Sequence, residues 1–273
     1  MTLLSSIQIE KILQRDVYKK KIAILPVGCV EQHGPFLPIE TDSLIASSIS
    51  AAVSSRLAES NFYWSYVFPE THYSPTKSNA HYPGTVSVEE DAFRCYLKSI
   101  LISILDTSFD VLVIMNAHGP ADISIREIEF NLMHDQFQKR SNALIPVISV
   151  SLADESKLLE DEFHIRGGKH ADWREFILLY TILGEQYFTD EVLTHMNNFQ
   201  NQNNFEIFNY GVIGIPMEYR TVQGVIGNPI PFTGSSQDFK VFSVKVWNFL
   251  VNSVTQKILN QIKAFDQFKD TLK

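Results

Sequence analysis

The sequence predicts an α/β fold in which helices cover both faces of a mostly parallel sheet. Short runs that are almost entirely apolar alternate along the chain with longer segments whose apolar residues recur at helical spacing. The run over residues 111–115 reads Val-Leu-Val-Ile-Met, which is typical of a strand buried on both faces. Buried strands that alternate with helices form right-handed βαβ units, and such units build a parallel sheet.

The first half of the chain contains two predicted strands and two predicted helices. Residues 21–30 form an apolar run of strand length, and residues 63–68 are the second strand candidate. Between them, residues 41–59 carry apolar residues at helical spacing, with Asp42 near the start. A second helix is predicted over residues 88–107, because its first turn is acidic and the helix dipole favours carboxylates there.

The second half continues the alternation. The strand over residues 111–115 ends at a turn and leads into a helix, whose apolar residues are Ile125, Ile128 and Leu132. Residues 144–152 form another largely apolar strand, and residues 173–184 form another helix. An amphipathic helix over residues 242–264 closes the chain.

We expect one domain over residues 1–273, because the sequence shows no internal repeat and no linker long enough to separate domains. A loop rich in Ser, Pro, Asn and Gly is predicted over residues 74–84. Residues 196–204, rich in Asn and Gln, are expected to form a surface loop or an insertion.

Composition argues against several classes of function. Apolar residues make up 45% of the chain and aromatic residues 12%, as in folded globular proteins. The formal net charge of -8 argues against nucleic-acid binding. The chain has two cysteines, Cys29 and Cys95, no secretory pattern, and no apolar run long enough to span a membrane. We therefore expect a soluble cytoplasmic protein that binds neither nucleic acid nor membranes.

Three potential metal ligands, Glu31, His33 and Asp42, follow the first predicted strand. Glu31 and His33 are two residues apart, so their side chains project from the same side of an extended backbone. A mixed carboxylate and imidazole set at the end of a buried strand is typical of a hydrolytic divalent-metal site. The alternative is a polar loop in which Asp42 only caps the next helix.

Two further clusters follow later strands. His118 leaves the strand over residues 111–115 at a turn, where a lone histidine is commonly a hydrogen-bonded structural residue. His170 precedes the helix over residues 173–184, and Glu175 lies in its first turns, where a local ion pair is the simpler interpretation. Because ligands bind at the carboxyl ends of parallel strands, we expect the three clusters to converge.

Convergence would supply five ligands for two divalent metal ions: Glu31, His33, Asp42, His118 and Glu175. One carboxylate, most simply Asp42, could bridge the two ions. Two ions about 3.5–4 Å apart activate water and polarise a carbonyl oxygen in two-metal hydrolases. His170 is then left as a proton donor to the leaving nitrogen. Such a ligand set accepts zinc, manganese or iron.

These motifs resemble those of the creatininase family, the creatinine amidohydrolase-like metal-dependent amidases. The matching stretches follow the family's order from residue 25 to residue 229. They are Leu25-Pro-Val-Gly-Cys-Val-Glu-Gln-His-Gly-Pro-Phe-Leu-Pro with Thr41-Asp42, Tyr82-Pro-Gly-Thr85, Met115-Asn-Ala-His-Gly119, His170-Ala with Glu175, and Gly224-Val-Ile-Gly-Asn-Pro229. The first stretch is highly specific, and the others add weight through their order.

The resemblance implies a three-layer α/β/α sandwich, commonly assembled as a homo-oligomer (a hexamer), with a two-metal centre. The implied activity is hydrolysis of a non-peptide C–N bond in a small-molecule substrate, a cyclic amide or a formamide. By resemblance, Glu31, Asp42 and His118 would hold one ion. His33, Asp42 and Glu175 would hold the other, and His170 would transfer the proton.

The chain departs from the family around the expected substrate. After the position of Gly119 the family commonly continues Gly-Asn, where this chain has Pro120-Ala121. Creatinine-cleaving members have a glutamate two residues after the position of His118, where this chain has Pro120. Where the family usually has His-Ala-Gly, this chain has His170-Ala-Asp172, and Lys169 directly precedes His170. A lysine beside the reaction centre adds positive charge and favours an anionic substrate or intermediate, so creatinine is not the expected substrate.

Three hypotheses remain open at the level of sequence. The first is a two-metal amidohydrolase of a small cyclic amide or formamide. The second is an enzyme that deformylates a pyrimidine nucleotide intermediate or trims a peptide, with Arg126, Lys169 or Arg174 binding a phosphate or carboxylate. The third is a catalytically silent, metal-binding scaffold subunit. The candidate substrate contacts are Tyr73, Ser78, Lys169 and Trp173.

Overall fold

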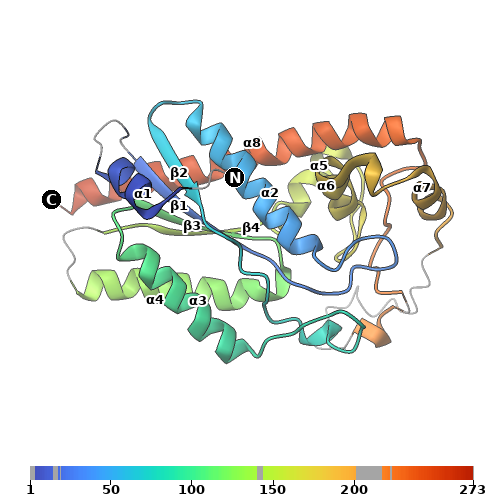
Figure 1. Cartoon of the computed structure of the whole chain (residues 1–273), viewed down its shortest axis with the longest axis horizontal. Helices are drawn as coiled ribbons and strands as arrows, with labels where there is room; N and C mark the ends of the chain where they lie inside the picture. The colour runs from blue at the N-terminus through green and yellow to red at the C-terminus, as the bar shows by residue number, and fades with distance from the viewer. Residues whose placement is uncertain are drawn as a thin grey trace.

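The computed structural model describes residues 4–14, 18, 20–139, 144–200, 217–221 and 223–272. At its centre lies a parallel sheet of four strands in the order β2-β1-β3-β4 (Figure 1). The strands are β1 (Lys20–Val27), β2 (Tyr63–Val67), β3 (Val111–Asn116) and β4 (Val147–Ser151). Every pairing among these strands is parallel, as the alternation in the sequence predicts.

The described residues form eight α-helices: α1 (Ser6–Leu13), α2 (Thr41–Ala58), α3 (Glu90–Leu105), α4 (Asp122–Gln138), α5 (Ser156–Phe163), α6 (Trp173–Leu183), α7 (Asp190–Asn197) and α8 (Ser236–Thr271). The sequence does not predict α1, α5 and α7, because each has eight residues, too few for a clear helical period. α8 begins six residues before the predicted start, where Ser235 and Asp238 form a capping box.

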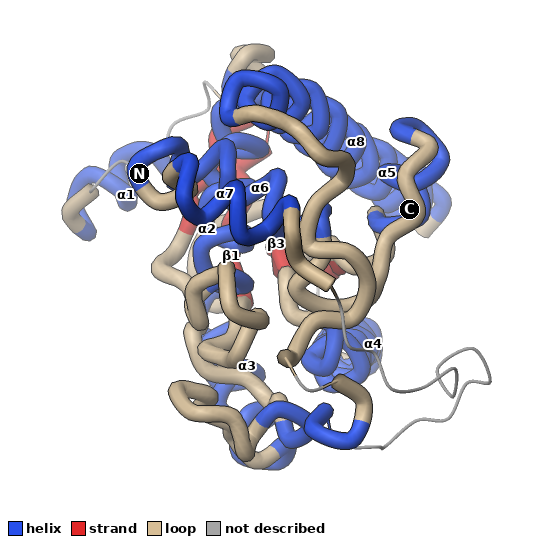
Figure 2. Tube along the Cα trace, turned by 90° about the vertical axis from the view of Figure 1, so that its right-hand side faces the viewer, coloured by secondary structure: helices blue, strands red, loops and turns tan. Residues whose placement is uncertain are grey.

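Alternate residues of each strand pack into two different cores. Ile22 and Ile24 of β1 pack with α2, α6 and α8, whereas Ala23 and Leu25 pack with α3 and α4. The helices therefore form a layer on each face of the sheet, as Figure 1 and Figure 2 show from two directions. The three-layer α/β/α sandwich that the resemblance implies is confirmed. Burial of each large apolar side chain contributes roughly 1.5–3 kcal/mol, so the two cores hold the sheet firmly.

The strand order brings two polar loops together at one point of the sheet. β1 and β3 are neighbours, but β1 leads into α2 on one face and β3 leads into α4 on the other. In open parallel sheets, ligands bind at the carboxyl ends of two neighbouring strands whose following connections go to opposite faces of the sheet. The segments that follow β1 and β3 carry the first two predicted ligand clusters.

Two predicted segments differ from the structure. β1 ends at Val27 instead of residue 30, because Gly28 brings the chain against the start of α2; a Cβ on Gly28 would lie 2.5 Å from the backbone of Ser43. The expected loop over residues 196–204 begins inside α7, and its residues 201–204 lie outside the described part of the chain. No helix of the described part is both long and apolar enough to cross a membrane.

Candidate metal centre

The structure brings the five predicted ligands together at the carboxyl ends of β1 and β3. Glu31 and His33 follow β1, and His118 follows β3. Asp42 lies in the first turn of α2 and Glu175 in the first turn of α6. The first four residues are almost completely buried, and Glu175 is partly exposed at the mouth of a cavity.

Asp42 occupies the middle of this cluster. Its Oδ1 lies 3.3 Å from Nε2 of His33, and its Oδ2 lies 2.9 Å from Nδ1 of His118. Each histidine faces a second carboxylate as well: Oε2 of Glu175 is 3.9 Å from His33 Nε2, and Oε1 of Glu31 is 3.4 Å from His118 Nδ1. The cluster thus divides into two sets of two carboxylates and one imidazole, and Asp42 belongs to both.

Backbone carbonyl groups orient the two imidazole rings. Nδ1 of His33 lies 3.1 Å from the carbonyl oxygen of Glu31, and Nε2 of His118 lies 2.9 Å from that of Pro75. Each of these nitrogens can donate its proton to the carbonyl, which leaves the lone pair of the neutral ring on the other nitrogen. In both rings that other nitrogen is the one that faces Asp42, which is the orientation a metal ligand needs.

Glu31 is held by a loop whose role the sequence does not reveal. Its Oε2 accepts hydrogen bonds from the hydroxyl of Thr76 and, at 2.7 Å, from Nδ2 of Asn79. Thr76 and Asn79 are themselves buried, in the loop predicted over residues 74–84. These contacts leave Oε1 of Glu31 free to face His118. Sequence reasoning missed both residues, because a loop carries no periodic pattern to show which side chains turn inward.

His170 reaches the same cluster from the segment before α6. Its Nε2 lies 2.7 Å from the carbonyl oxygen of Gln32, and its Nδ1 lies 3.6 Å from Oε1 of Glu31. The next residue, Ala171, has a φ of 52°, a left-handed conformation that non-glycine residues rarely adopt. Backbone pairing between His170 and Ile226 holds this turn in place. Burial lowers the pKa of His170, and the positive charge on His33 lowers it further.

The motif over residues 224–229 closes this part of the site. Gln32 donates from Nε2 to the carbonyl oxygen of Gly224 at 3.3 Å. Gly224 has a φ of +72°, and a Cβ there would collide with the side chain of Gln32. Residues 224–229, which are weak evidence as a sequence motif, therefore have a structural role. They pack against Gln32, whose carbonyl group orients His170.

Asp172 and Arg174 form a pair that starts α6. Asp172 caps the helix by accepting from the backbone N–H of Arg174 at 2.9 Å, and it also accepts from the N–H of Gly168 at 2.7 Å. The guanidinium of Arg174 lies 2.5 Å from the same carboxylate. Arg174 is therefore engaged by Asp172, and Arg126 is likewise paired with Asp154 at 2.6 Å.

The buried cluster shifts the pKa of each member. Burial alone would raise the pKa of Glu31 and of Asp42, but the neighbouring histidines lower both. Burial disfavours the charged form of His33, yet Asp42 and Glu175 raise its pKa to about 10; Glu31 and Asp42 likewise raise the pKa of His118 well above its usual value. Burial raises the pKa of Glu175 to about 7. Without metal, protons on the histidines supply the positive charge that the carboxylates require.

The unpaired atoms of the cluster fit a cation better than they fit protons alone. His33 Nε2 and Glu175 Oε2 are both buried, and neither has a hydrogen-bond partner of normal geometry among the described residues. A buried polar group without a partner costs about 1–3 kcal/mol. A divalent ion would satisfy both atoms, and a mixed nitrogen and oxygen set suits zinc, manganese or iron. The residues present therefore fit divalent metal ions.

A cavity of about 120 Å³ opens beside the cluster. Its lining includes Pro120 and Lys169 together with His170 and four of the predicted ligands, Glu31, Asp42, His118 and Glu175. The other three candidate substrate contacts lie elsewhere: Tyr73 is half exposed, Ser78 is partly buried outside the cavity, and Trp173 is 0% exposed in the core. Trp173 faces the core because it is on the inner side of the first turn of α6, a side that the sequence cannot identify.

Known proteins match this chain in sequence. A family model described as "Creatininase: Creatinine amidohydrolase" matches residues 5–236. The mycofactocin precursor peptide peptidase of Mycobacterium ulcerans (strain Agy99) is 33% identical over 100 residues, which are 35% of this chain and 39% of that protein. The 3-dehydro-scyllo-inosose hydrolase of Thermotoga maritima is 29% identical over 36% of this chain and 30% of its own length. The creatinine amidohydrolase of Pseudomonas putida is 26% identical over 42% of this chain and 46% of its own length. The matched stretches thus span less than half of each relative.

Solved creatininase structures share the fold. A structure described as "Creatininase Mn" has a TM-score of 0.73 at 16% identity, over 94% of this chain and 96% of that chain. A mutant creatininase of Zn-Zn type has a TM-score of 0.70 at 16% identity, again over 94% and 96% of the two chains. At this level of identity the likeness concerns the fold alone.

Proposed function

Since the chain belongs to the creatininase family, we propose that it is a dinuclear metal-dependent amidohydrolase that cleaves a non-peptide C–N bond in a small cyclic amide or formamide. The observation that carries this proposal is the position of Asp42. Its two oxygens face two different histidines, and each histidine faces a second carboxylate. One buried carboxylate shared by two ligand sets is what a two-metal hydrolase requires.

The ligand sets divide between the two proposed ions. Glu31, Asp42 and His118 would hold one, and His33, Asp42 and Glu175 would hold the other. Bound there, the ions would supply Lewis-acid chemistry, polarising a carbonyl oxygen and lowering the pKa of water. Zinc, manganese and iron all suit these donors, and creatininases of known structure are described with Mn and as Zn-Zn type.

His170 is the proposed proton-transfer residue. The carbonyl of Gln32 fixes the ring through Nε2, so Nδ1 is the atom that can hold or release a proton toward the cavity. The ring lies against that of His33, with centroids 4.4 Å apart, and borders the cavity. In the proposed reaction, Nδ1 donates a proton to the nitrogen that leaves when the C–N bond breaks.

The substrate is proposed to carry an anionic group. Two divalent ions would outweigh the three carboxylates of the centre, and Lys169 adds further positive charge at the cavity. The Lys169 ammonium forms no hydrogen bond or ion pair within the described part of the chain, whereas Arg174 is engaged by Asp172. A lysine without an internal partner can bind a carboxylate or a phosphate.

Peptide trimming is the second candidate function. It has one specific observation in its favour, the 33% identity to a mycofactocin precursor peptide peptidase. Against it stands the small cavity, about 120 Å³, since pockets for drug-sized ligands measure roughly 300–1,000 Å³. Deformylation of a pyrimidine nucleotide intermediate is compatible with Lys169, whose charge suits a phosphate.

Metal analysis and a substrate panel test the proposal together. We expect two divalent ions per chain in the reconstituted protein, and at most one in His33→Ala or His118→Ala. The exposed His195 on α7 provides the matched control, because His195→Ala should keep both ions. A protein that binds no stoichiometric metal would contradict the proposal. A biological activity of the protein that survives in His33→Ala at the wild-type level, with no hydrolysis of any substrate in the panel, would favour the silent scaffold.

Pairs of amides with and without a carboxylate test the anionic substrate. Lys169→Met should lower kcat/KM for the anionic member roughly 10- to 100-fold, as expected when one charged hydrogen bond is lost, and leave the neutral member unchanged. Lys263→Met, on an exposed position of α8, is the control. An equal loss for both members would refute a role in charge recognition.

Oligomeric state and location are also proposed from the family resemblance. A cytoplasmic homo-oligomer, commonly a hexamer, is the expectation. The exposed side chains of Ile123 and Phe130 on α4, 78% and 69% exposed, are compatible with a contact between subunits. Light scattering of the purified protein measures the assembly directly.

A further inference from the structure

A buried thiol, which the proposed reaction does not use, lies beside the proposed metal centre. Cys29 directly follows the Gly28 that ends β1, and its side chain is 0% exposed. One residue separates it from the first proposed ligand, Glu31, so it comes from the same short segment of backbone. Free cysteines are often buried as small apolar side chains, and that is the simplest account of Cys29.

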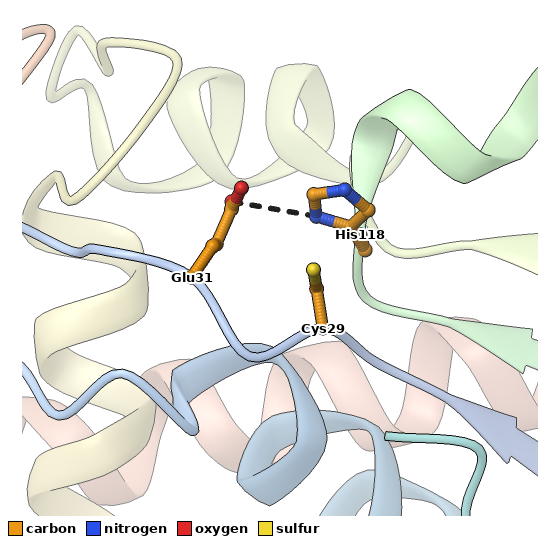
Figure 3. A group of neighbouring side chains, drawn as sticks. All are labelled: Cys29, Glu31 and His118. Atoms are coloured by element: carbon orange, nitrogen blue, oxygen red, sulfur yellow. Dashed lines mark ion pairs between the residues drawn. The ribbon is translucent and has the colours of Figure 1, made fainter. Parts of the chain in front are cut away.

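The direction of the side chain does not fit that account. Figure 3 shows the sulfur pointing into the space between the carboxylate of Glu31 and the ring of His118. One potential ligand atom from each of the three residues lies within 4.8 Å of the other two. A thiol that served only as apolar filling would be expected among apolar side chains, whereas Cys29 faces a carboxylate and an imidazole.

The backbone around Cys29 is firmly held. The hydroxyl of Ser74 donates a hydrogen bond to the carbonyl oxygen of Gly28 at 2.8 Å. The N–H of Gly28 donates to the carbonyl oxygen of Thr71 at 2.9 Å. The sulfur lies 3.8 Å from the carbonyl oxygen of Ser74, a weak contact, and it also forms a hydrogen bond with the ring of His118. A weak S–H donor of this kind is readily given up when a cation offers a stronger bond.

We propose that Cys29 is an additional metal ligand at the Glu31 and His118 side of the centre, and that it biases this position toward zinc over manganese. The proposal rests on the metal centre proposed above. When the ion binds, the S–H bond breaks, the proton leaves to water and a sulfur–metal bond forms, with no change of oxidation state. Thiolate is a soft ligand that suits zinc and cobalt, whereas manganese prefers oxygen.

Cobalt provides a direct reading of sulfur coordination. A thiolate bound to Co²⁺ gives an intense charge-transfer band in the near ultraviolet, while nitrogen and oxygen ligands give only weak visible bands. We expect Co²⁺ titration of the metal-free protein to produce the ultraviolet band, saturating with one of the two ions. Cys29→Ser should abolish this band and keep the visible bands, because the other ligands remain.

The second cysteine supplies the control. Cys95 lies exposed on α3, away from the centre, so Cys95→Ser removes adventitious thiol binding and should keep the full ultraviolet band. In metal competition, Cys29→Ser should lower the preference for zinc over manganese about tenfold or more, the scale on which lost metal contacts act. Cys95→Ser should leave that preference unchanged.

The outcomes separate this proposal from the proposed function. Two cobalt ions bound to Cys95→Ser without an ultraviolet band would overturn the role of Cys29 and leave the metal centre intact. Failure to bind any cobalt would overturn both. If Cys29→Ser folds poorly, Cys29→Ala gives a second variant, and a band that persists in either one contradicts the proposal.

Discussion

At the scale of single residues, Asp42 has the largest expected effect. It is the one carboxylate that faces both His33 and His118, so its loss should affect both proposed ions. We predict that Asp42→Ala lowers the metal content from two ions to fewer than one and reduces hydrolysis to background. Asp161→Ala, exposed on α5, should change neither. Retention of both ions in Asp42→Ala, measured by elemental analysis, would rule out a shared carboxylate.

Protons should leave the ligands when metal binds. The pKa of His33 is raised to about 10 and the pKa of His118 lies well above its usual value. In the metal-free protein at pH 7, both rings are therefore positively charged imidazolium groups with a proton on each nitrogen. A metal needs the lone pair that this proton occupies, so binding at pH 7 releases protons and the apparent affinity rises with pH. Calorimetry in buffers of different ionisation enthalpy measures the release; a binding heat that does not depend on the buffer would contradict this prediction.

Single residues also show where sequence reasoning stops. The proposed ligands Glu31, His33 and His118 follow strand ends, and parallel strands bring such positions together, so their convergence could be predicted. Thr76 and Asn79 could not be predicted, because their contacts with Glu31 depend on the path of an irregular loop. Trp173 shows the same limit, since its burial depends on which side of α6 meets the core.

At the scale of elements, the approach of α2 to the end of β1 positions Asp42. A Cβ on Gly28 would lie 2.5 Å from the backbone of Ser43. This clash could be relieved only if β1 or α2 moved. We predict that Gly28→Ala destabilises the protein by roughly 1–3 kcal/mol, the range for overpacked sites, and weakens metal binding because Asp42 shifts. Urea unfolding and metal titration measure the two effects.

Gly119 provides the matched control for that substitution. A Cβ there would meet nothing within 4 Å, and its φ is not positive. Gly119→Ala should therefore keep the stability of the wild type. If both substitutions had the same effect, the close contact between β1 and α2 would not be the cause.

Element lengths were predictable where the pattern is long. The helices α2, α3 and α6 and all four strands appear within a few residues of the predicted bounds. The eight-residue helices α1, α5 and α7 escaped prediction because two turns are too short to show a clear apolar period. α8 extends beyond its predicted range at both ends, and it begins early at the capping box of Ser235 and Asp238.

At the scale of the whole molecule, the proposed centre joins one helical layer to the ends of the two central strands. Its ligands come from α2 and α6 on one face and from the loops after β1 and β3 at the sheet edge. Bound metal should therefore stabilise the entire fold. At a free metal concentration of 100 Kd the stabilisation is about 2.7 kcal/mol.

We predict that removal of metal with EDTA lowers the Tm by roughly 5–10 °C, since about 1 kcal/mol corresponds to a few degrees in a protein of this size. Adding back zinc or manganese should restore the Tm. His195→Ala should show the same shift as the wild type, and Asp42→Ala should show none. An EDTA-treated wild type with an unchanged Tm would mean that metal does not contribute to stability.

Anomalous diffraction from crystals of the zinc-loaded protein would locate the proposed ions themselves. The account predicts two peaks, one bounded by Glu31 and His118 and the other by His33 and Glu175, with the carboxylate of Asp42 touching both. A single peak, or two peaks that Asp42 does not join, would contradict it.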